Sequence, residues 1–169
     1  AIPSPYTMGL MDKFFNLKLM PTIQTNRGCP YECTFCADGE LLNKKIHRKS
    51  ESYMREELEY IAKHVKLSPT LAFCDLNFGM YKQDIGTAKI IADIRKKYNW
   101  PDQMYGSTGK SQPKRMAEIG KIINQNGLDI IRMGSSLQSV NPEVLQAVKR
   151  KNLSFDELRG LHSNKADSQ

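Results

Sequence analysis

Three cysteines lie within one short segment and are the clearest candidates for chemistry in this sequence. Cys29, Cys33 and Cys36 have the spacing C-x3-C-x2-C, and the 169-residue chain holds only one other cysteine, Cys74. Three bunched thiols in a chain with so few cysteines favour a metal centre over disulfide bonds. At this spacing they can hold one face of a cubane iron–sulfur cluster and leave one iron with an open coordination position for a ligand.

Other uses of these thiols follow from the same residue types. A structural zinc ion would need a fourth ligand, and His47 is the only histidine near the loop. Three buried cysteines without a metal are a further alternative. Cys74 offers a fourth thiolate, but the apolar residues Leu71, Ala72 and Phe73 precede it, so we expect Cys74 in the core of a strand.

The cysteines follow the first of four predicted strand–helix units. Apolar runs predict strands at 20–25, 70–75, 103–107 and 129–133. Helical periodicity or capping residues predict helices at 52–66, 84–98 and 142–149. A further helix is predicted to begin at 113 and to end at the stop signal Asn126-Gly127. A capping box, Ser154 to Glu157, predicts one more helix start. This alternation predicts an α/β fold with a parallel sheet and right-handed crossovers. The cysteine loop then lies at the carboxyl edge of the sheet, where ligands bind in such folds.

The composition is that of one globular domain with excess positive charge. The chain has 25 Lys and Arg against 18 Asp and Glu, a net charge of +7, and 40% hydrophobic residues, which excludes a disordered, collagen-like or coiled-coil chain. No apolar run predicts a membrane span and no signal peptide is recognisable, so we expect a cytoplasmic protein. The basic stretches at 44–49 and 149–151 are typical of solvated surface, or attract a phosphate-bearing substrate or nucleic acid.

The cysteine loop resembles that of the radical S-adenosylmethionine superfamily. Members carry C-x3-C-x2-C after the first strand, usually with an aromatic residue before the third cysteine, and Phe35 occupies that place here. The resemblance implies that Cys29, Cys33 and Cys36 hold a 4Fe–4S cluster whose open iron binds the amino and carboxylate groups of S-adenosylmethionine, with Phe35 near the adenine. Reductive cleavage of S-adenosylmethionine would then give a 5′-deoxyadenosyl radical that abstracts a hydrogen from the substrate.

Two longer stretches resemble the barrel of cobalamin-binding radical enzymes, IPSPYTMGLMDKFF and PTIQTNRGCPYECTFCADG. The resemblance implies that residues 1–19 form an interdomain linker with a short helix. Residues 20–169 would form the N-terminal two-thirds of a partial parallel (β/α)6 barrel, truncated after about four βα units, with cobalamin bound mainly outside this chain. It also implies that Asp75 and Asn77 bind the amino group of S-adenosylmethionine, and that Ser136 and Gln138 contact its ribose.

The function implied is radical modification of a small-molecule substrate, by methylation or rearrangement, with a one-electron reductant such as flavodoxin or ferredoxin. A catalytically incomplete iron–sulfur fragment or electron-transfer module is an alternative. A radical enzyme that modifies transfer RNA is another, suggested by the net charge but less favoured than a small-molecule substrate. No membrane partner is expected.

Overall fold

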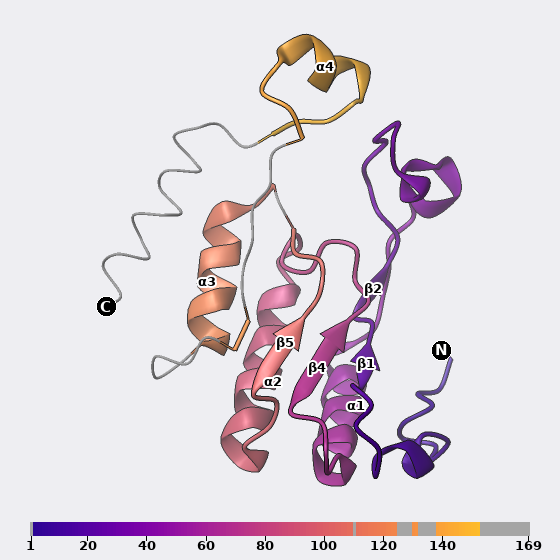
Figure 1. Cartoon of the computed structure of the whole chain (residues 1–169), viewed down its shortest axis with the longest axis vertical. Helices are drawn as coiled ribbons and strands as arrows, with labels where there is room; N and C mark the ends of the chain where they lie inside the picture. Colours follow the sequence, from indigo (N-terminus) through magenta and orange to yellow (C-terminus); the bar gives the residue numbers. More distant parts are fainter. Residues whose placement is uncertain (1, 110, 125–129, 132–137, 153–169) are drawn as a thin grey trace.

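The computed structural model describes residues 2–109, 111–124, 130–131 and 138–152. Its centre is a parallel three-stranded sheet of order β1-β4-β5, formed by Thr22–Ile23 (β1), Thr70–Phe73 (β4) and Gln103–Tyr105 (β5) (Figure 1). A parallel bridge from Met104 to Ile131 marks the position of the predicted fourth strand beside β5. The strands therefore lie in the sheet in the order in which the chain makes them.

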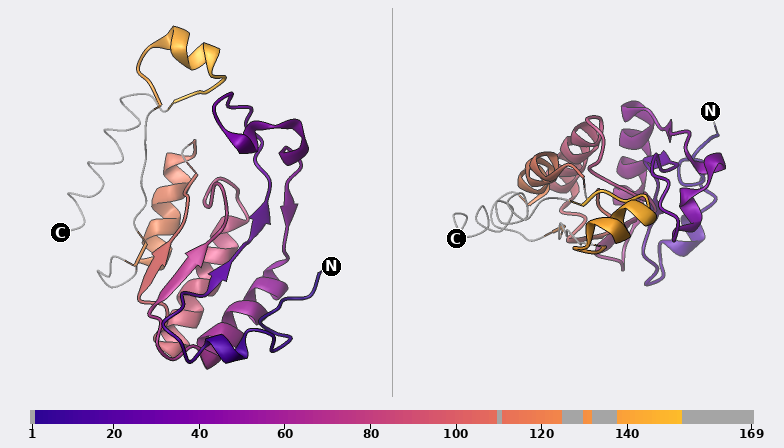
Figure 2. Two further views of the ribbon diagram at one scale, coloured as in Figure 1. Left: turned by 45° about the vertical axis from the view of Figure 1, so that its right-hand side comes forward. Right: turned by 90° about the horizontal axis from the view of Figure 1, so that it is seen from above.

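The three long helices lie on one face of this sheet. These are Glu51–His64 (α1), Asp84–Tyr98 (α2) and Pro113–Ile123 (α3), and α2 packs between α1 and α3 (Figures 1 and 2). A doubly wound open sheet would carry helices on both faces, whereas sequential parallel strands with one-sided helices are the winding of a (β/α) barrel. The predicted α/β fold of partial-barrel type is confirmed over these units.

Burial alternates in β1 and β5, whereas all four residues of the central strand β4 are buried. Ile23, Leu71, Phe73, Met104 and Ile131 lie toward the helices and are all buried. Among the described residues, no helix covers the opposite face.

On that opposite face, Thr22, Ala72 and Tyr105 lie in register, and Tyr105 is 60% exposed. The expectation that Cys74 lies in the core is wrong, because β4 ends at Phe73 and Cys74 is exposed. Its side chain falls on the face of Ala72, two residues earlier, which no described helix covers.

Helix limits follow the sequence signals closely, whereas the strands are shorter than predicted. Helix α2 has its predicted bounds, and Ser50 caps α1 by accepting a hydrogen bond from the Tyr53 amide. Asn141 caps Pro142–Ala147 (α4), which ends before the predicted position 149. The Asn126-Gly127 stop signal and the capping box from Ser154 to Glu157 lie outside the described residues.

An antiparallel ribbon that the sequence did not predict carries the cysteine loop. Asn26–Arg27 (β2) pairs with His47–Arg48 (β3), and the segment between them holds the short helices Ala37–Gly39 (η2) and Leu41–Asn43 (η3). In Figure 2 this ribbon rises from the end of β1 beyond the main sheet. Both strands are two polar residues long, so hydrophobic alternation could not indicate them.

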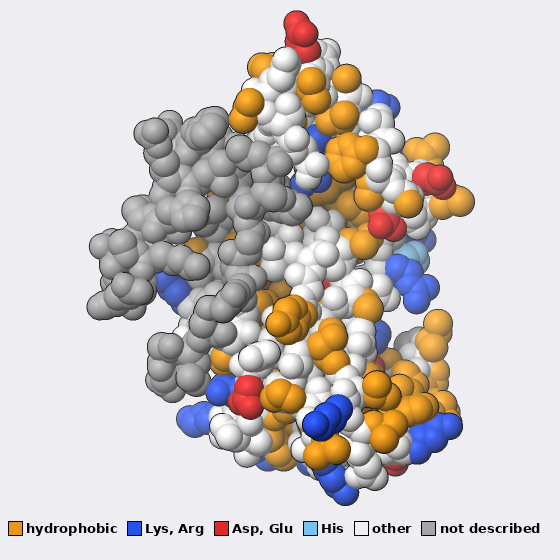
Figure 3. All heavy atoms as spheres, in the orientation of Figure 1, with side chains coloured by type: hydrophobic (Ala, Val, Ile, Leu, Met, Phe, Trp, Pro, Cys, Tyr) orange, Lys and Arg blue, Asp and Glu red, His pale blue; other side chains and the backbone are white. Residues whose placement is uncertain are grey.

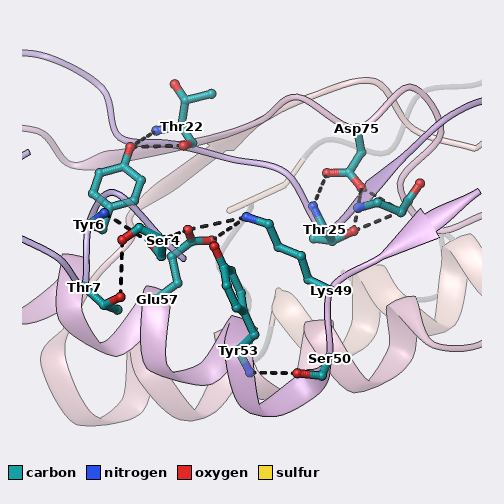
Figure 4. A network of polar contacts seen from close by, with 11 residues as sticks. Ser4, Tyr6, Thr7, Thr22, Thr25, Lys49, Ser50, Tyr53, Glu57 and Asp75 are labelled. Carbon is teal, nitrogen blue, oxygen red and sulfur yellow. Dashed lines mark hydrogen bonds and ion pairs between the residues drawn. The ribbon is translucent and has the colours of Figure 1, made fainter. Parts of the chain in front are cut away.

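The N-terminal segment packs onto the domain. Tyr6 and Phe15, which flank Asp12–Phe14 (η1), are buried in the main core. The Tyr6 hydroxyl donates to the Thr22 carbonyl at 3.0 Å and accepts from the Thr22 amide at 2.9 Å, so the segment is tied to β1 (Figure 4).

Apolar side chains also gather on the surface of this segment, at the lower right of Figure 3. The exposed ones are Ile2, Met8, Leu10, Leu17 and Leu19. Within the part of the chain that the structure describes, no helix has the length and hydrophobicity needed to span a membrane.

A buried carboxylate joins this segment to α1 and to the end of the ribbon. Glu57 is 2% exposed, accepts a hydrogen bond from the Ser4 hydroxyl at 2.6 Å, and pairs with the Lys49 ammonium at 3.2 Å (Figure 4). Lys49 directly follows β3, so this contact fixes where the ribbon leads into α1.

Replacing Lys49 tests the importance of this contact. Lys49→Met should lower the free energy of unfolding by about 1–3 kcal/mol, because it leaves the buried Glu57 carboxylate without its counter-charge. Urea denaturation measures the change. Lys63→Met, which removes only a surface pair with Glu59, should cost less than about 0.5 kcal/mol. Equal losses in the two variants would contradict the assignment.

Candidate functional site

Asp75 fastens together the carboxyl ends of β1 and β4. It follows β4, is 2% exposed, and its two oxygens accept hydrogen bonds from the amides of Thr25 and Asn26, each at 2.9 Å. The Thr25 hydroxyl and the Asn26 side-chain amide also donate to it, at 2.5 Å and 2.7 Å. The carboxylate thus holds the chain where it leaves the sheet and enters the ribbon.

The charge state of Asp75 is set by burial against these hydrogen bonds. Burial raises its pKa above the ordinary value of 3.8, and the Thr25 and Asn26 donors only partly offset that rise. Its predicted role with the amino group of S-adenosylmethionine stays a prediction. In this structure both its oxygens are engaged within the chain.

Asn77 connects the loop after β4 to the first cysteine. Its side chain is 8% exposed, and its Nδ2 atom donates to the Cys29 sulfur at 3.3 Å. Residues 48 positions apart in the sequence are therefore brought together at the carboxyl edge, as the parallel-sheet argument required. The structure places Asn77 beside a predicted cluster ligand, and its predicted contact with S-adenosylmethionine stays a prediction.

Two glycines shape the loop between β2 and β3. Gly28 has φ +104°, and a Cβ there would lie 2.5 Å from the Lys45 carbonyl and 2.8 Å from that of Asn43. Next to it, the Cys29 amide donates to the Asn43 carbonyl at 2.8 Å. Gly39 packs directly on the backbone of Cys33. The two ends of the loop can approach each other only because these side chains are absent.

The three cysteines lie in different environments within this loop. Cys33 is buried, Cys29 is partly exposed and Cys36 is exposed, with the Cys36 amide donating to the Cys33 carbonyl at 3.1 Å. Among the described residues, no three His, Cys, Asp or Glu side chains are arranged as ligands of one metal ion. A cubane cluster takes one thiolate on each of three irons, so its cysteines stand further apart than the ligands of a single ion. Phe35 is 56% exposed beside them.

A segment far along the chain covers one side of the loop. The Thr34 amide donates to the Val148 carbonyl at 3.3 Å, just after α4. The Arg150 guanidinium donates to the Cys33 sulfur at 3.5 Å and lies 4.9 Å from the centre of the Tyr31 ring. Arg150 therefore puts a positive charge against the cysteine loop.

Tyr81 approaches the loop from the segment between β4 and α2. Its ring lies 3.8 Å from the Arg48 guanidinium, on β3. Burial raises the pKa of Tyr81, the Arg48 charge opposes that rise, and Cys29 adds to it. Among the described side chains, its hydroxyl is the one buried nitrogen or oxygen without a hydrogen-bond partner.

Of the predicted ribose contacts, Ser136 lies outside the described residues. Gln138 is exposed, and its backbone amide donates to the Asn152 side-chain oxygen at 3.4 Å. Sequence reasoning missed Tyr31, Tyr81 and Arg150. Arg150 lies 117 positions from its partner Cys33, so no local pattern could indicate it. Tyr81 follows the Asp75–Asn77 stretch, and its position just after a predicted strand was the sequence signal that could have indicated a place in the site.

No family model matches the chain, but individual relatives do. It is 31% identical, over 97% of its length, to the cobalamin-dependent radical SAM methyltransferase TokK of Streptomyces tokunonensis. It is 32% identical, again over 97%, to the 2-(S-pantetheinyl)-carbapenam-3-carboxylate methyltransferase of Streptantibioticus cattleyicolor. The chain spans 24% of the length of each.

A solved structure has the same fold. The cobalamin-dependent S-adenosylmethionine radical enzyme OxsB, with aqua-cobalamin and S-adenosylmethionine bound, matches 92% of this chain and 23% of its own with a TM-score of 0.63 and 18% identity. The fold and the cysteine loop together define a radical S-adenosylmethionine type of domain. The chain is homologous to cobalamin-dependent radical S-adenosylmethionine methyltransferases and corresponds to about a quarter of their length.

The described residues fit the iron–sulfur cluster that this relationship implies. Three free cysteines belong to one loop at the carboxyl edge, and the hydrogen bonds from Asn77 and Arg150 to the sulfurs of Cys29 and Cys33 are of the kind that thiolate ligands of a cluster accept. The unpaired Tyr81 hydroxyl lies among groups of the same site and has a hydrogen bond to give.

Replacing Asp75 tests how the edge is held. In the wild type, the folded chain holds the Asp75 proton more tightly than the unfolded chain does. Its free energy of unfolding should therefore fall as the pH rises from the ordinary value of 3.8 through the raised pKa. Asp75→Asn should lack this slope. At neutral pH it should cost about 1–3 kcal/mol, because an amide cannot accept all four hydrogen bonds.

Urea denaturation across the acidic range measures both effects. Asp84, whose pKa is also raised by burial, is kept in both proteins, but the Asp75 charge adds to that rise, so the Asp84 contribution to the slope should be smaller in Asp75→Asn. Asp93→Asn, at an exposed surface pair with Arg55, should change the unfolding free energy by less than about 0.5 kcal/mol. Identical pH profiles for the wild type and Asp75→Asn would show that Asp75 does not titrate as described.

Proposed function

We propose that this chain is the part of a cobalamin-dependent radical enzyme that holds a 4Fe–4S cluster and S-adenosylmethionine. Cys29, Cys33 and Cys36 would each ligate one iron. The substrate would be a small molecule, modified by methylation or rearrangement. The observation that carries the proposal is the cysteine loop itself, fastened at the carboxyl edge of a barrel-type sheet by Asn77 on one side and Arg150 on the other.

The bound 4Fe–4S cluster would supply reductive cleavage of S-adenosylmethionine, and the residues of this chain would position the cluster and S-adenosylmethionine. A one-electron reductant such as flavodoxin or ferredoxin would deliver the electron. Cobalamin would bind mainly through parts of the protein beyond this chain, because the relatives that carry it in their names are about four times as long.

Arg150 has the position and charge to bind the carboxylate of S-adenosylmethionine. It is a cation held against Cys33 and over the Tyr31 ring. A carboxylate that chelates the open iron would come close to the loop, and a guanidinium binds carboxylates through two parallel hydrogen bonds. Lys149, the next cation, is turned toward Glu32 at 3.9 Å and is 63% exposed.

Cysteine replacement tests the cluster assignment. The chain is reconstituted anaerobically with iron and sulfide, and its iron content and electron paramagnetic resonance spectrum are measured with and without S-adenosylmethionine. Changing Cys29, Cys33 or Cys36 to Ala should abolish the 4Fe–4S signal. Cys74→Ala, at an exposed cysteine outside the loop, should keep it. Full iron content in the loop variants would overturn the assignment.

The same spectra separate two functions. A signal that changes with S-adenosylmethionine supports a cofactor-binding radical enzyme, whereas a signal that ignores it supports an iron–sulfur module.

Arg150→Met tests the carboxylate contact. The S-adenosylmethionine concentration that gives half of the spectral change should rise about tenfold or more, which corresponds to losing one charge-assisted pair. Lys149→Met should change that concentration by less than about twofold, because its charge is solvated. A similar shift in both variants would mean that general positive charge, and not the position of Arg150, binds the cofactor.

A further inference from the structure

The Tyr81 hydroxyl is buried without a hydrogen-bond partner, although its surroundings are polar. The backbone amide of Tyr81 donates to the Asp84 carboxylate at 2.9 Å, and the same carboxylate accepts from the Gly79 amide at 2.8 Å. The backbone of Tyr81 is thus fixed just before the start of α2.

The Tyr81 ring is fixed as well. The Arg48 guanidinium lies 3.8 Å from the ring centre, and Arg48 is itself held by a 2.8 Å hydrogen bond to the Gln83 side chain. Arg48 of the ribbon therefore holds the ring, while Asp84 at the start of α2 holds the Tyr81 backbone. A buried hydroxyl without a partner costs folding free energy, so it calls for a group that arrives later.

The neighbours of the hydroxyl identify that group. Besides burial, the groups that affect the pKa of Tyr81 are Arg48, which lowers it, and Cys29, Asp84 and Tyr31, which raise it, so these groups lie near the Tyr81 side chain. Cys29 and Tyr31 both belong to the cysteine loop, and the Cys29 sulfur accepts a hydrogen bond from Asn77, which lies four residues before Tyr81. Arg48 is occupied by the ring and by Gln83, and Asp84 by backbone amides.

We propose that the Tyr81 hydroxyl donates a hydrogen bond to the iron–sulfur cluster on its Cys29 side and so favours the reduced cluster. The inference rests on the proposed function. Thiolate and sulfide sulfurs accept hydrogen bonds, and the acceptor strengthens when an electron is added to the cluster. Hydrogen bonds to the sulfurs are one of the means by which proteins set the potential of such clusters.

Tyr81→Phe in the reconstituted chain tests this contact, because it removes the hydroxyl and keeps the clamped ring. In a redox titration without S-adenosylmethionine, the ratio of reduced to oxidised cluster at a fixed potential should fall about tenfold, equivalent to about 59 mV for a one-electron couple. Iron content should be unchanged.

Two comparisons separate this role from a structural one. Before reconstitution, Tyr81→Phe should unfold at the same or a higher urea concentration than the wild type, because it removes an unpaired buried hydroxyl. Tyr98→Phe, whose hydroxyl donates to Glu59 at 2.7 Å on α1, should leave the cluster potential unchanged. A lower urea midpoint for unloaded Tyr81→Phe would mean that the hydroxyl has a structural partner, and would overturn the proposal.

The remaining outcomes are also decisive. A wild-type cluster with an unchanged potential in Tyr81→Phe overturns this inference and leaves the proposed function standing. A shift that appears only when S-adenosylmethionine is present means that the hydroxyl binds the cofactor, which also overturns it. A wild-type chain that takes up no cluster overturns the proposed function together with the inference.

Discussion

The buried carboxylate of Asp75 is the contact on which the rest of the site depends. It accepts four hydrogen bonds from Thr25 and Asn26 at the point where the first strand becomes the ribbon. The ribbon positions the cysteine loop, and the segment after Asp75 positions Asn77 and Tyr81 against that loop. The Asp75 side chain thereby holds both parts of the site, the cysteine loop and the segment with Asn77 and Tyr81, at the edge of the sheet.

The arrangement of strands and helices places the candidate site at one edge of the sheet. All three long helices cover the same face of the sheet, and the opposite face is lined by Thr22, Ala72 and Tyr105. In a (β/α) barrel that second face is the interior. The cysteine loop, the Asp75 contact and the exposed Cys74 all lie at its carboxyl edge.

Sequence patterns predicted the elements that bury apolar surface and missed those that do not. Helix α2 has its predicted limits because its apolar periodicity is long. Metal binding by the loop was predicted from residue type and spacing, and it stays a prediction. The ribbon was missed because its strands are short and polar. Cys74 was misplaced because an apolar run cannot reveal that one face of its strand is uncovered. Arg150 was missed because its contact with Cys33 depends on the path of the whole chain.

The contacts of Val148 and Arg150 with the cysteine loop also order events during synthesis. Asp75 and its donors lie within 50 positions of each other, so the edge of the sheet can close while later residues are still being made. The side of the loop that Arg150 covers stays open until more than a hundred further residues have followed Cys33. Until residues 148–150 have been made, the loop would therefore be anchored to the sheet but uncovered on that side.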